Sequence, residues 1–514
     1  MIVPPHPDTS RTLHPPLLRR ACYAILITAA AGVMLGRILA VTSVDVQLLE
    51  RQRLQDIPKE LETRRAEYAA RGITGDRLEA EMARIEKALR DRAALSRPFL
   101  SANDRSRWCT VRALVEPEMR VPGAPYAIDR VIQEPRWDTI DMVKHDGHLY
   151  SSKPPLFPTL LAGLYWVILH TTGWTLRDQP YEIARAVLIL VHWLPLIACL
   201  AGIASLVERF AGNDWTRIFV LAAGCFGTFL STMVVTLNNH LPGAACAFGA
   251  LFFAVPIFRD GRCETWRFVV VGFLAAFAVT FELPSLILFV ALLGFLALVS
   301  LHRTVLYFLP AALLVGAAYF YTNWLAHGTL TIPYSHRADG GDNWYDYTYE
   351  RRGRLIESYW RNPVGIDKGE PSIAAYVFHS LVGHHGIFSL TPIWLLTAGG
   401  IWFACRGEDR RWRAFAATVA AASLVCLIFY WTRDLRARNY GGLSCGFRWM
   451  FWWAPFWLLL MVPALDRLAR SRWGRGFALL CLAVSAMSAA YPTWSPWVHP
   501  WLFRWLEYQG WIAY

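Results

Sequence analysis

Hydrophobic residues recur along the chain in runs that are long enough to cross a lipid bilayer, and short polar segments separate most of them. A spanning helix needs about 20 mainly apolar residues, because the hydrocarbon core is about 30 Å thick. By this criterion the chain contains about eleven candidate spans. They are residues 21–44, 184–206, 218–235, 241–258, 268–281, 285–301, 305–324, 386–405, 414–431, 449–465 and 477–491. The pattern predicts an all-α polytopic membrane protein.

Three polar segments are long, at residues 45–183, 327–372 and 432–448. In the first of them, the charged stretch 47–95 carries apolar residues at helical spacing and predicts a helical hairpin. Residues 156–170 follow two prolines and are apolar, and we expect them to form a helix that lies in the membrane interface. The remaining loops are too short to build a site. Any chemistry is therefore expected on the face that carries the three long loops.

The distribution of arginine orients the chain. Lys and Arg concentrate in cytoplasmic loops, and the arginines of the short loops fall on the side of Arg19 and Arg20 if residues 156–170 do not cross. We therefore expect a cytoplasmic N-terminus, an outer C-terminus and an inner (plasma) membrane location. The predicted organisation is a cytoplasmic segment 1–20, a core 21–301 with outer loop 45–183, C-terminal helices 302–493, and an outer tail 494–514 rich in Trp and Pro.

Composition agrees with a membrane protein. Of the 514 residues, 55% are hydrophobic and only 18% are charged, whereas soluble domains carry about 25% charged residues. The net charge of +12 follows mainly from the loop arginines, so nucleic acid is not a predicted partner. The cysteines show no metal-binding spacing.

Two segments of the first outer loop carry candidate chemistry. Asp104 follows Asn103 between the charged hairpin and an amphipathic stretch, and it can act either as a helix cap or as a catalytic base. Asp-Gly-His-Leu-Tyr-Ser-Ser-Lys-Pro-Pro at 146–155 holds Tyr150 and Lys153 just before the interfacial helix. Prolines restrict the backbone there, so Lys153 is placed to meet a lipid phosphate. Its alternative is ordinary snorkelling of a long side chain to the headgroups.

Polar side chains at the ends of predicted spans form a second group. Asn239 and His240 precede the span at 241–258, and Glu282 interrupts the chain between two spans. Ionisable groups at membrane depth need a partner or water, so these residues either contact substrate or serve local structure. His385 is the second of two adjacent histidines, which point in different directions on a helix and do not favour a shared metal ion.

Arginines gather in the outer loop 432–448, against the usual preference for the cytoplasmic side. Arg438 and Arg448 flank a glycine-containing segment at 439–446. Guanidinium groups match phosphate oxygens in geometry and charge, so we interpret the pair as a phosphate site. The alternative is unselective binding of headgroups. Asp138, Asp141 and Asp146 match no metal-binding loop and are interpreted as turn residues. No metal or other cofactor is predicted, and a divalent metal has no support from the spacing.

Taken together, an early loop Asp, Tyr-Ser-Ser-Lys-Pro-Pro at 150–155 and the polytopic core resemble the GT-C glycosyltransferases, over about residues 20–301 and again near 439–449. The nearest members are those that use a polyprenyl-phosphate sugar, such as protein mannosyltransferases and aminoarabinose transferases. The resemblance implies that Asp104 activates the acceptor and Lys153 meets the donor phosphate. Many members have Asp-Glu at the first motif, whereas Arg105 follows Asp104 here. That difference argues against a two-carboxylate mechanism.

The expected function is transfer of a sugar from a polyprenyl-phosphate donor to a lipid, protein or glycan acceptor on the extracytoplasmic face, by inverting single displacement. Asp104 would be the base, and Lys153, Arg438 and Arg448 would bind the phosphate. The expected substrate contacts are Tyr150, Asn239, His240, Glu282 and His385. The alternatives are a lipid or polysaccharide transporter or flippase, which would place polar groups near the middle of the membrane, and a non-catalytic scaffold. The sequence does not identify the sugar or the acceptor.

Overall fold

The computed structural model describes residues 15–41, 49–93, 99, 101–134, 136–337, 342–492 and 494–514. Residues 1–14 of the predicted cytoplasmic segment lie outside the described residues. So do residues 47–48 and 94–95, at the two ends of the predicted hairpin.

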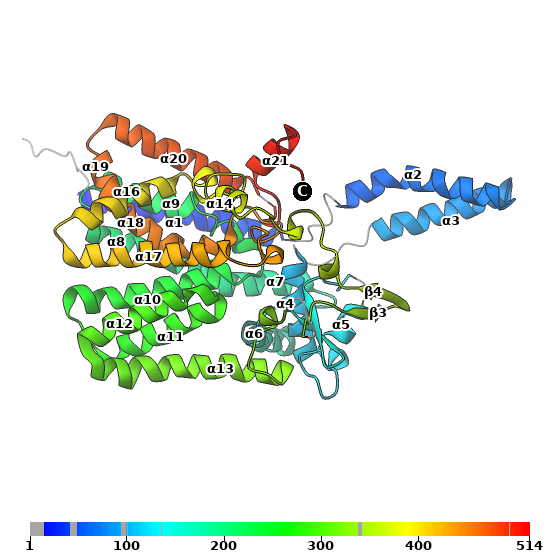
Figure 1. Ribbon diagram of the computed structural model, residues 1–514, viewed down its shortest axis with the longest axis horizontal. Coiled ribbons are helices and arrows are strands. Elements are labelled where there is room, and N and C mark those ends of the chain that lie inside the picture. The colour runs from blue at the N-terminus through cyan, green and yellow to red at the C-terminus, as the bar shows by residue number, and fades with distance from the viewer. Residues whose placement is uncertain are drawn as a thin grey trace, which may run out of the picture.

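Helices dominate the described chain, and most of them run side by side in one bundle (Figure 1). The bundle helices are α1 (Pro15–Leu39), α7 (Pro180–Leu188), α8 (Leu194–Phe210), α9 (Asp214–Phe226), α10 (His240–Asp260), α11 (Thr265–Phe281), α12 (Leu286–Arg303), α13 (Leu309–His327), α16 (Ile393–Arg406), α17 (Arg410–Trp431), α18 (Ala454–Leu460), α19 (Val462–Leu468) and α20 (Arg472–Ala490). A π-helical turn, Ile189–Trp193, joins α7 to α8, and another, Thr304–Phe308, joins α12 to α13.

The remaining elements gather toward one end of this bundle (Figure 1). They are α2 (Leu49–Ala70), α3 (Asp76–Ala93), α4 (Ala102–Val115), α5 (Asp129–Gln133), α6 (Leu156–Thr172), α14 (Ile373–Leu381), α15 (Ile387–Leu390) and α21 (Trp501–Tyr508). Two antiparallel hairpins, β1 (Met142–His145) with β2 (His148–Ser151) and β3 (Thr348–Arg351) with β4 (Arg354–Glu357), are the only sheets in the described ranges.

Among the described residues, six helical segments are long and apolar enough to cross a membrane, or seven when the bent pair Arg448–Leu460 and Val462–Leu468 counts as one span. The chain is therefore an all-α, multi-pass membrane protein, as the sequence predicts; a count of eleven spans is not confirmed. One segment, Leu283–His327, is 45 residues long, about twice what a bilayer requires. It bends at Ser300 (φ −159°, ψ 92°), so α12 and α13 are two separate helices of the bundle (Figure 1).

Arginines of the predicted cytoplasmic loops meet at one end of the bundle, where acidic side chains pair with them. Ion pairs join the starts and ends of five helices there: Arg19 with Glu208 and Asp214, Arg209 with Asp260, and Arg259 with Asp409. These helix ends therefore share one face. The predicted outer loops and the C-terminus lie at the opposite end (Figure 1).

The charged stretch of the first outer loop forms α2 and α3, which pack against each other and project from the bundle (Figure 1). Ile57 of α2 and Met82 of α3 are buried, whereas most of the hairpin surface is exposed. Arg65 and Glu79 form an ion pair of 2.8 Å between the two helices. This hairpin lies away from the cavity described below.

In the part of the bundle formed by α10 to α13, drawn low in Figure 1, helix backbones approach each other closely, and glycine makes this approach possible. A Cβ atom at Gly272 of α11 would lie 2.3 Å from the carbonyl oxygen of Phe308. Small residues let membrane helices approach closely, because packing rather than the hydrophobic effect drives their association. Gly294 of α12, in contrast, has no atom within 4 Å of such a Cβ.

We therefore expect Gly272→Ala to lower the thermal stability of the protein in detergent, because overpacking costs about 1–3 kcal/mol. The matched variant Gly294→Ala should leave the melting temperature unchanged or raise it slightly, because alanine favours the helix. Melting curves followed by tryptophan fluorescence measure both. Equal melting temperatures for the two variants would contradict the packing seen here.

Candidate active site

A cavity of about 780 Å³ lies where the first outer loop, the two later outer loops and several bundle-helix ends meet. Ligand sites for small molecules commonly occupy about 300–1,000 Å³. Ten charged side chains of the described residues line it, six of them cationic and four of them acidic. The cationic ones are Arg105, Arg107, Lys153, Arg337, Arg433 and Arg448, and the acidic ones are Asp138, Asp141, Glu282 and Asp367. The excess of positive charge favours an anionic ligand.

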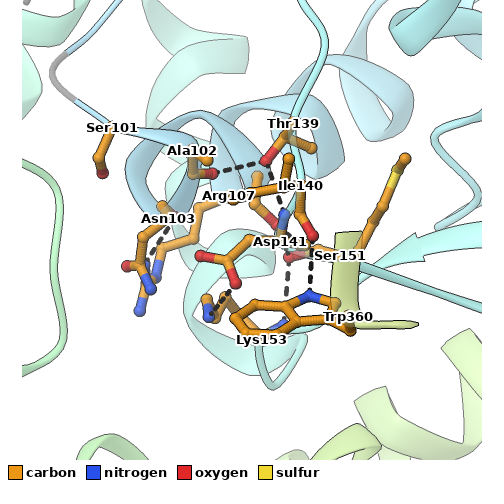
Figure 2. Close-up of polar contacts among 12 residues, drawn as sticks. Ser101, Ala102, Asn103, Arg107, Thr139, Ile140, Asp141, Ser151, Lys153 and Trp360 are labelled. Carbon is orange, nitrogen blue, oxygen red and sulfur yellow. Dashed lines mark hydrogen bonds and ion pairs between the residues drawn. The ribbon is translucent and has the colours of Figure 1, made fainter. Parts of the chain in front are cut away.

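Lys153 and Asp141 form the ion pair at one wall of this cavity (Figure 2). The Lys153 side chain is 7% exposed, and its Nζ lies 3.2 Å from Oδ1 of Asp141. The β1–β2 hairpin places both residues, since Asp141 directly precedes β1 and Lys153 closely follows β2. The backbone carbonyl of Asp141 accepts hydrogen bonds from Ser152 N and from Oγ of Ser106 in α4. The pair is thus fixed from both sides of the hairpin and from α4.

Neighbouring cations keep Asp141 ionised. Burial by itself raises the pKa of this carboxyl, but the charge of Lys153 and its hydrogen bond, then Arg448 and Arg107, outweigh burial. The net effect holds the pKa of Asp141 below its ordinary value. A carboxylate in contact with several cations is stabilised in its charged form.

Asp104 lies close by, but its carboxylate does not line the cavity. Ser101, not Asp104, caps α4, because its Oγ accepts from the backbone N–H of Asp104. The Asp104 carboxylate is 3% exposed and accepts hydrogen bonds of 2.9 Å from Trp108 Nε1 and Thr236 Oγ1. Its neighbours Asn103, Arg105 and Arg107 line the cavity instead, and Asn103 and Arg107 are drawn in Figure 2. Of the two predicted residues, Lys153 therefore lines the cavity and Asp104 does not.

A chain of buried polar contacts connects three other predicted residues to the cavity arginines. Asn239 accepts from Arg107 (2.8 Å) and donates to Glu282 (3.0 Å). Glu282 Oε1 lies 2.5 Å from Nδ1 of His240, whose Nε2 lies 2.8 Å from Nη1 of Arg448. Since arginine only donates, Nε2 of His240 accepts and Nδ1–H donates to Glu282. His240 is therefore neutral in this arrangement and orients Arg448.

Helix packing at this point depends on Gly243, near the start of α10. A Cβ atom there would lie 2.9 Å from Cγ of Glu282. Glu282 itself interrupts the helical path between α11 and α12 with an extended backbone (φ −132°, ψ 95°). The polar residues at these helix ends thus face the cavity, as their position in the sequence suggests for ionisable groups at membrane depth.

The glycines of the loop 432–448 bring its backbone close to two charged groups. Gly441 has φ +95°, and its carbonyl accepts from Nε of Arg448 at 2.7 Å. A Cβ atom at Gly442 (φ +74°) would lie 3.0 Å from Oδ1 of Asp367. Positive φ and such close approach both favour glycine. Gly441 thus contacts Arg448, and the adjoining Gly442 lies beside Asp367.

Three predicted site residues lie off the cavity wall. Arg438 does not line the cavity, although Arg433 of the same loop does. The backbone carbonyl of Arg438 accepts a hydrogen bond from the backbone N–H of Glu370. Tyr150 is buried in the β hairpin, with its ring 4.9 Å from that of His327. His385 is fully buried and stacks on Tyr440 at 5.2 Å, with Nδ1 2.5 Å from Nδ1 of His384. Lys153, Arg448, Asn239, His240 and Glu282 do line the cavity.

The three aspartates interpreted as turn residues differ from one another. Asp138 pairs with Arg351 at 3.1 Å, and Asp141 pairs with Lys153. Asp146 has φ +47° at the tip of the β1–β2 hairpin and is highly exposed. Only the last is a simple turn residue. Within the described ranges, no group of three or more His, Cys, Asp or Glu side chains is placed to hold a metal ion.

Other cavity residues were not singled out from the sequence. Asp367 follows the β3–β4 hairpin, and Tyr334, Arg337 and Trp360 come from the same outer loop 327–372. Their residue types are common in loops, so no sequence signal distinguishes them. The only hint is the length of the loop itself.

One wall of the cavity is apolar and comes from helices of the bundle and from α6. Its residues are Phe157, Val279, Phe281, Leu283, Pro284, Tyr319, Phe429 and Tyr430. The cavity thus combines a cationic wall with an apolar one. This combination suits an amphiphile with an anionic head and a hydrocarbon tail.

No protein-family model matches the sequence, and no curated protein sequence is similar to it. Among solved structures, the chain is similar to ArnT from Cupriavidus metallidurans in the apo state, with a TM-score of 0.44 and 12% identity over 77% of this chain. For the same protein bound to undecaprenyl phosphate the TM-score is 0.41, with 16% identity over 76% of this chain. The chain spans 64% and 66% of the length of those two structures.

A further similarity is to the oligosaccharyltransferase AglB from Archaeoglobus fulgidus in complex with an inhibitory peptide and a dolichol-phosphate. Its TM-score is 0.34, with 13% identity over 80% of this chain and 57% of that one. ArnT and AglB are GT-C glycosyltransferases, the group that the sequence motifs resemble.

Replacing Asp141 by Asn should change how stability depends on pH. A lowered pKa means that the ionised carboxylate stabilises the folded protein above the ordinary aspartate pKa of about 3.9. That contribution is lost as the pH falls through the lower value in the folded state. At pH 6 we expect Asp141→Asn to cost about 1–3 kcal/mol, because Lys153 loses its charged partner. The difference in melting temperature from the wild type should stay constant from pH 6 to about pH 4 and shrink only as the pH falls below about 3.9. A difference that does not shrink below that pH would contradict the assignment.

Proposed function

We propose that the protein is a membrane glycosyltransferase that moves a sugar from a polyprenyl-phosphate donor to an acceptor on the extracytoplasmic face of the inner membrane. The observation that supports this proposal most directly is the single cavity in which Lys153, Arg107 and Arg448 lie beside Asp141 and an apolar wall. ArnT, which is similar in part, has been solved with undecaprenyl phosphate. The acceptor is a hydroxyl or amine of a lipid, protein or glycan.

In this proposal the cationic wall binds the donor phosphate, and the apolar wall takes the first isoprene units. Lys153 is held 5.5 Å from the ring centre of Tyr334, and Arg448 is held by His240 and by the carbonyl of Gly441. The cations are therefore preorganised, so they need little rearrangement when charge develops on the leaving phosphate. Preformed groups of this kind contribute about 3–4 kcal/mol each in comparable enzymes.

Asp141 is the general base that the cavity geometry favours, in place of the Asp104 suggested by the sequence resemblance. Without donor, Asp141 neutralises Lys153. A bound phosphate competes for the same ammonium group, so the carboxylate loses part of the interaction that lowers its pKa. Asp141 then takes the proton of the acceptor hydroxyl or amine. The acceptor atom bonds to the anomeric carbon, and the bond from that carbon to phosphate breaks with its electron pair on polyprenyl phosphate.

A single displacement of this kind inverts the configuration at the anomeric carbon, and it needs one general base. Asp104 remains the alternative base, and its carboxylate would then have to leave Trp108 and Thr236 to reach the cavity. The two assignments predict different behaviour for two otherwise similar Asp→Asn variants. They can therefore be separated by experiment.

Lys153→Ala should weaken binding of undecaprenyl phosphate by about tenfold to a hundredfold, because it removes one charge-assisted contact. The matched control is Lys144→Ala, since Lys144 lies on the neighbouring strand β1 and bonds to the carbonyl of Thr348 outside the cavity. Binding to purified protein in detergent, followed by quenching of tryptophan fluorescence, measures both. Equal affinities for the two variants would refute the phosphate site.

Asp141→Asn should abolish transfer while undecaprenyl phosphate still binds. Asp104→Asn should instead lower thermal stability and leave substantial transfer, because its amide disturbs a buried network. Membranes that contain each variant are supplied with labelled polyprenyl-linked sugars, and label that reaches the acceptor fraction is counted. Normal transfer by Asp141→Asn together with none by Asp104→Asn would reverse the two roles.

A further inference from the structure

Four histidines gather beside the loop 432–448, and none of the four lines the cavity. This histidine cluster consists of His379, His384, His385 and His499. The ring centroids of His379 and His384 lie 4.0 Å apart, and those of His384 and His385 lie 4.8 Å apart. His499, just before α21, lies 6.0 Å from His385. The cluster therefore joins the end of α14 to the C-terminal segment, residues 494–514.

Hydrogen bonds fix where the protons of the buried pair His384 and His385 lie. The Tyr514 hydroxyl donates to Oε2 of Glu370 at 3.2 Å, so its oxygen accepts from Nε2–H of His384 at 2.8 Å. Neutral His384 is then bare at Nδ1, where it accepts from Nδ1–H of His385 at 2.5 Å. A further proton on His384 would have to displace that bond. Nε2 of His385 is buried and has no hydrogen-bond partner among the described residues. The closed arrangement thus requires both rings to be neutral.

Aromatic contacts connect the cluster to the loop that positions Arg448. Tyr440 stacks on His385 with the ring centroids 5.2 Å apart, and its hydroxyl donates to Glu370. Tyr440 has φ +57°, a conformation that a bulky residue keeps only when its surroundings hold it. The next residue, Gly441, accepts from Nε of Arg448 through its carbonyl. Displacement of His385 therefore frees the segment that positions Arg448.

Burial keeps the cluster uncharged. It is the largest cause that lowers the pKa of His499 to about 4 and that of His384 to about 2, and it holds the pKa of His385 well below its ordinary value. The charges of neighbouring histidines act in the same direction, whereas the backbone of Ser444 opposes burial at His385 only in part. The charged groups that face the cluster from other segments are Glu370, Arg504 and Glu507.

We propose that the histidine cluster is an acid-sensitive latch, which holds the C-terminal segment and the loop 432–448 in place only while its rings are neutral. Acid opens the latch because the open segments accept protons that the closed ones cannot. Each histidine that becomes charged on opening favours the open state about tenfold for every pH unit below about 6.5. Several histidines act together, so opening is steeper in pH than the titration of one group. Opening also releases Arg448 from Gly441 and weakens phosphate binding, and this last step alone rests on the proposed function.

Hydrogen–deuterium exchange of α21 between pH 7 and pH 5 tests the latch, because protection reports local opening. The full-length protein is used in detergent, and each rate is divided by the intrinsic rate at that pH. The protection factor of α21 should fall about a hundredfold or more per pH unit below pH 6, whereas that of α11 should stay constant. In His384→Gln the fall should be about tenfold smaller per pH unit, because one titrating group is lost. The matched control His170→Gln, at an exposed histidine of α6, should behave as the wild type does.

Two further variants separate titration from packing. Tyr514→Phe removes the hydroxyl between His384 and Glu370 but no histidine, so it should lower protection by the same factor at every pH. His499→Gln, at the edge of the cluster, should reduce the pH dependence as His384→Gln does. A wild-type fall of tenfold or less per pH unit would overturn the latch. So would a fall in His384→Gln and His499→Gln as steep as that of the wild type.

Binding of undecaprenyl phosphate, measured by quenching of tryptophan fluorescence, tests the link to Arg448. Between pH 7 and pH 5 the affinity of the wild type should fall at least about tenfold more than that of His384→Gln, because the variant opens less readily. Protonation of the phosphate itself is the same for both proteins and cancels in this comparison. Opening of α21 with equal changes in affinity would overturn the link. Absence of binding at pH 7 in the wild type would refute the proposed function, and the exchange rates would still decide whether the latch exists.

Discussion

The cavity depends on the chain of contacts that runs from Arg107 through Asn239, Glu282 and His240 to Arg448. It joins α4 of the first outer loop, the start of α10, the break between α11 and α12, and the last outer loop. Burying two arginine side chains costs desolvation free energy unless each one donates hydrogen bonds to acceptors. Because the acceptors come from segments far apart in the sequence, satisfying them also fixes those segments relative to one another.

The Lys153–Asp141 pair adds a second requirement to that framework. A buried lysine needs a counter-charge when the cavity holds no anion, and Asp141 supplies it. In the proposed reaction a donor phosphate competes with this carboxylate for Lys153, so one residue would stabilise the unloaded site and act as the base in the loaded one.

Much of the architecture followed from local physical constraints. Apolar runs of bilayer length predict membrane helices, and the arginines of short loops predict which helix ends share a face; the ion pairs of Arg19, Arg209 and Arg259 lie together at one such end. Lys153, held between Ser152 and two prolines, was identifiable for the same reason. The number of spans did not follow in the same way, since several helices are short or bent, and in the described ranges six or seven segments are long and apolar enough to cross a membrane.

The sequence by itself determined the class of protein, the polar loops that form the cavity and several of the residues that line it, because hydrophobic length and proline restriction act over a few neighbouring positions. It could not decide which aspartate faces the cavity. Asp104 and Asp141 lie in equally polar segments, and their directions depend on contacts with Thr236 and Lys153. Only the tertiary structure brings those partners together, because Asp104 and Thr236 lie 132 positions apart in the sequence and the Asp141–Lys153 pair depends on how the β1–β2 hairpin closes.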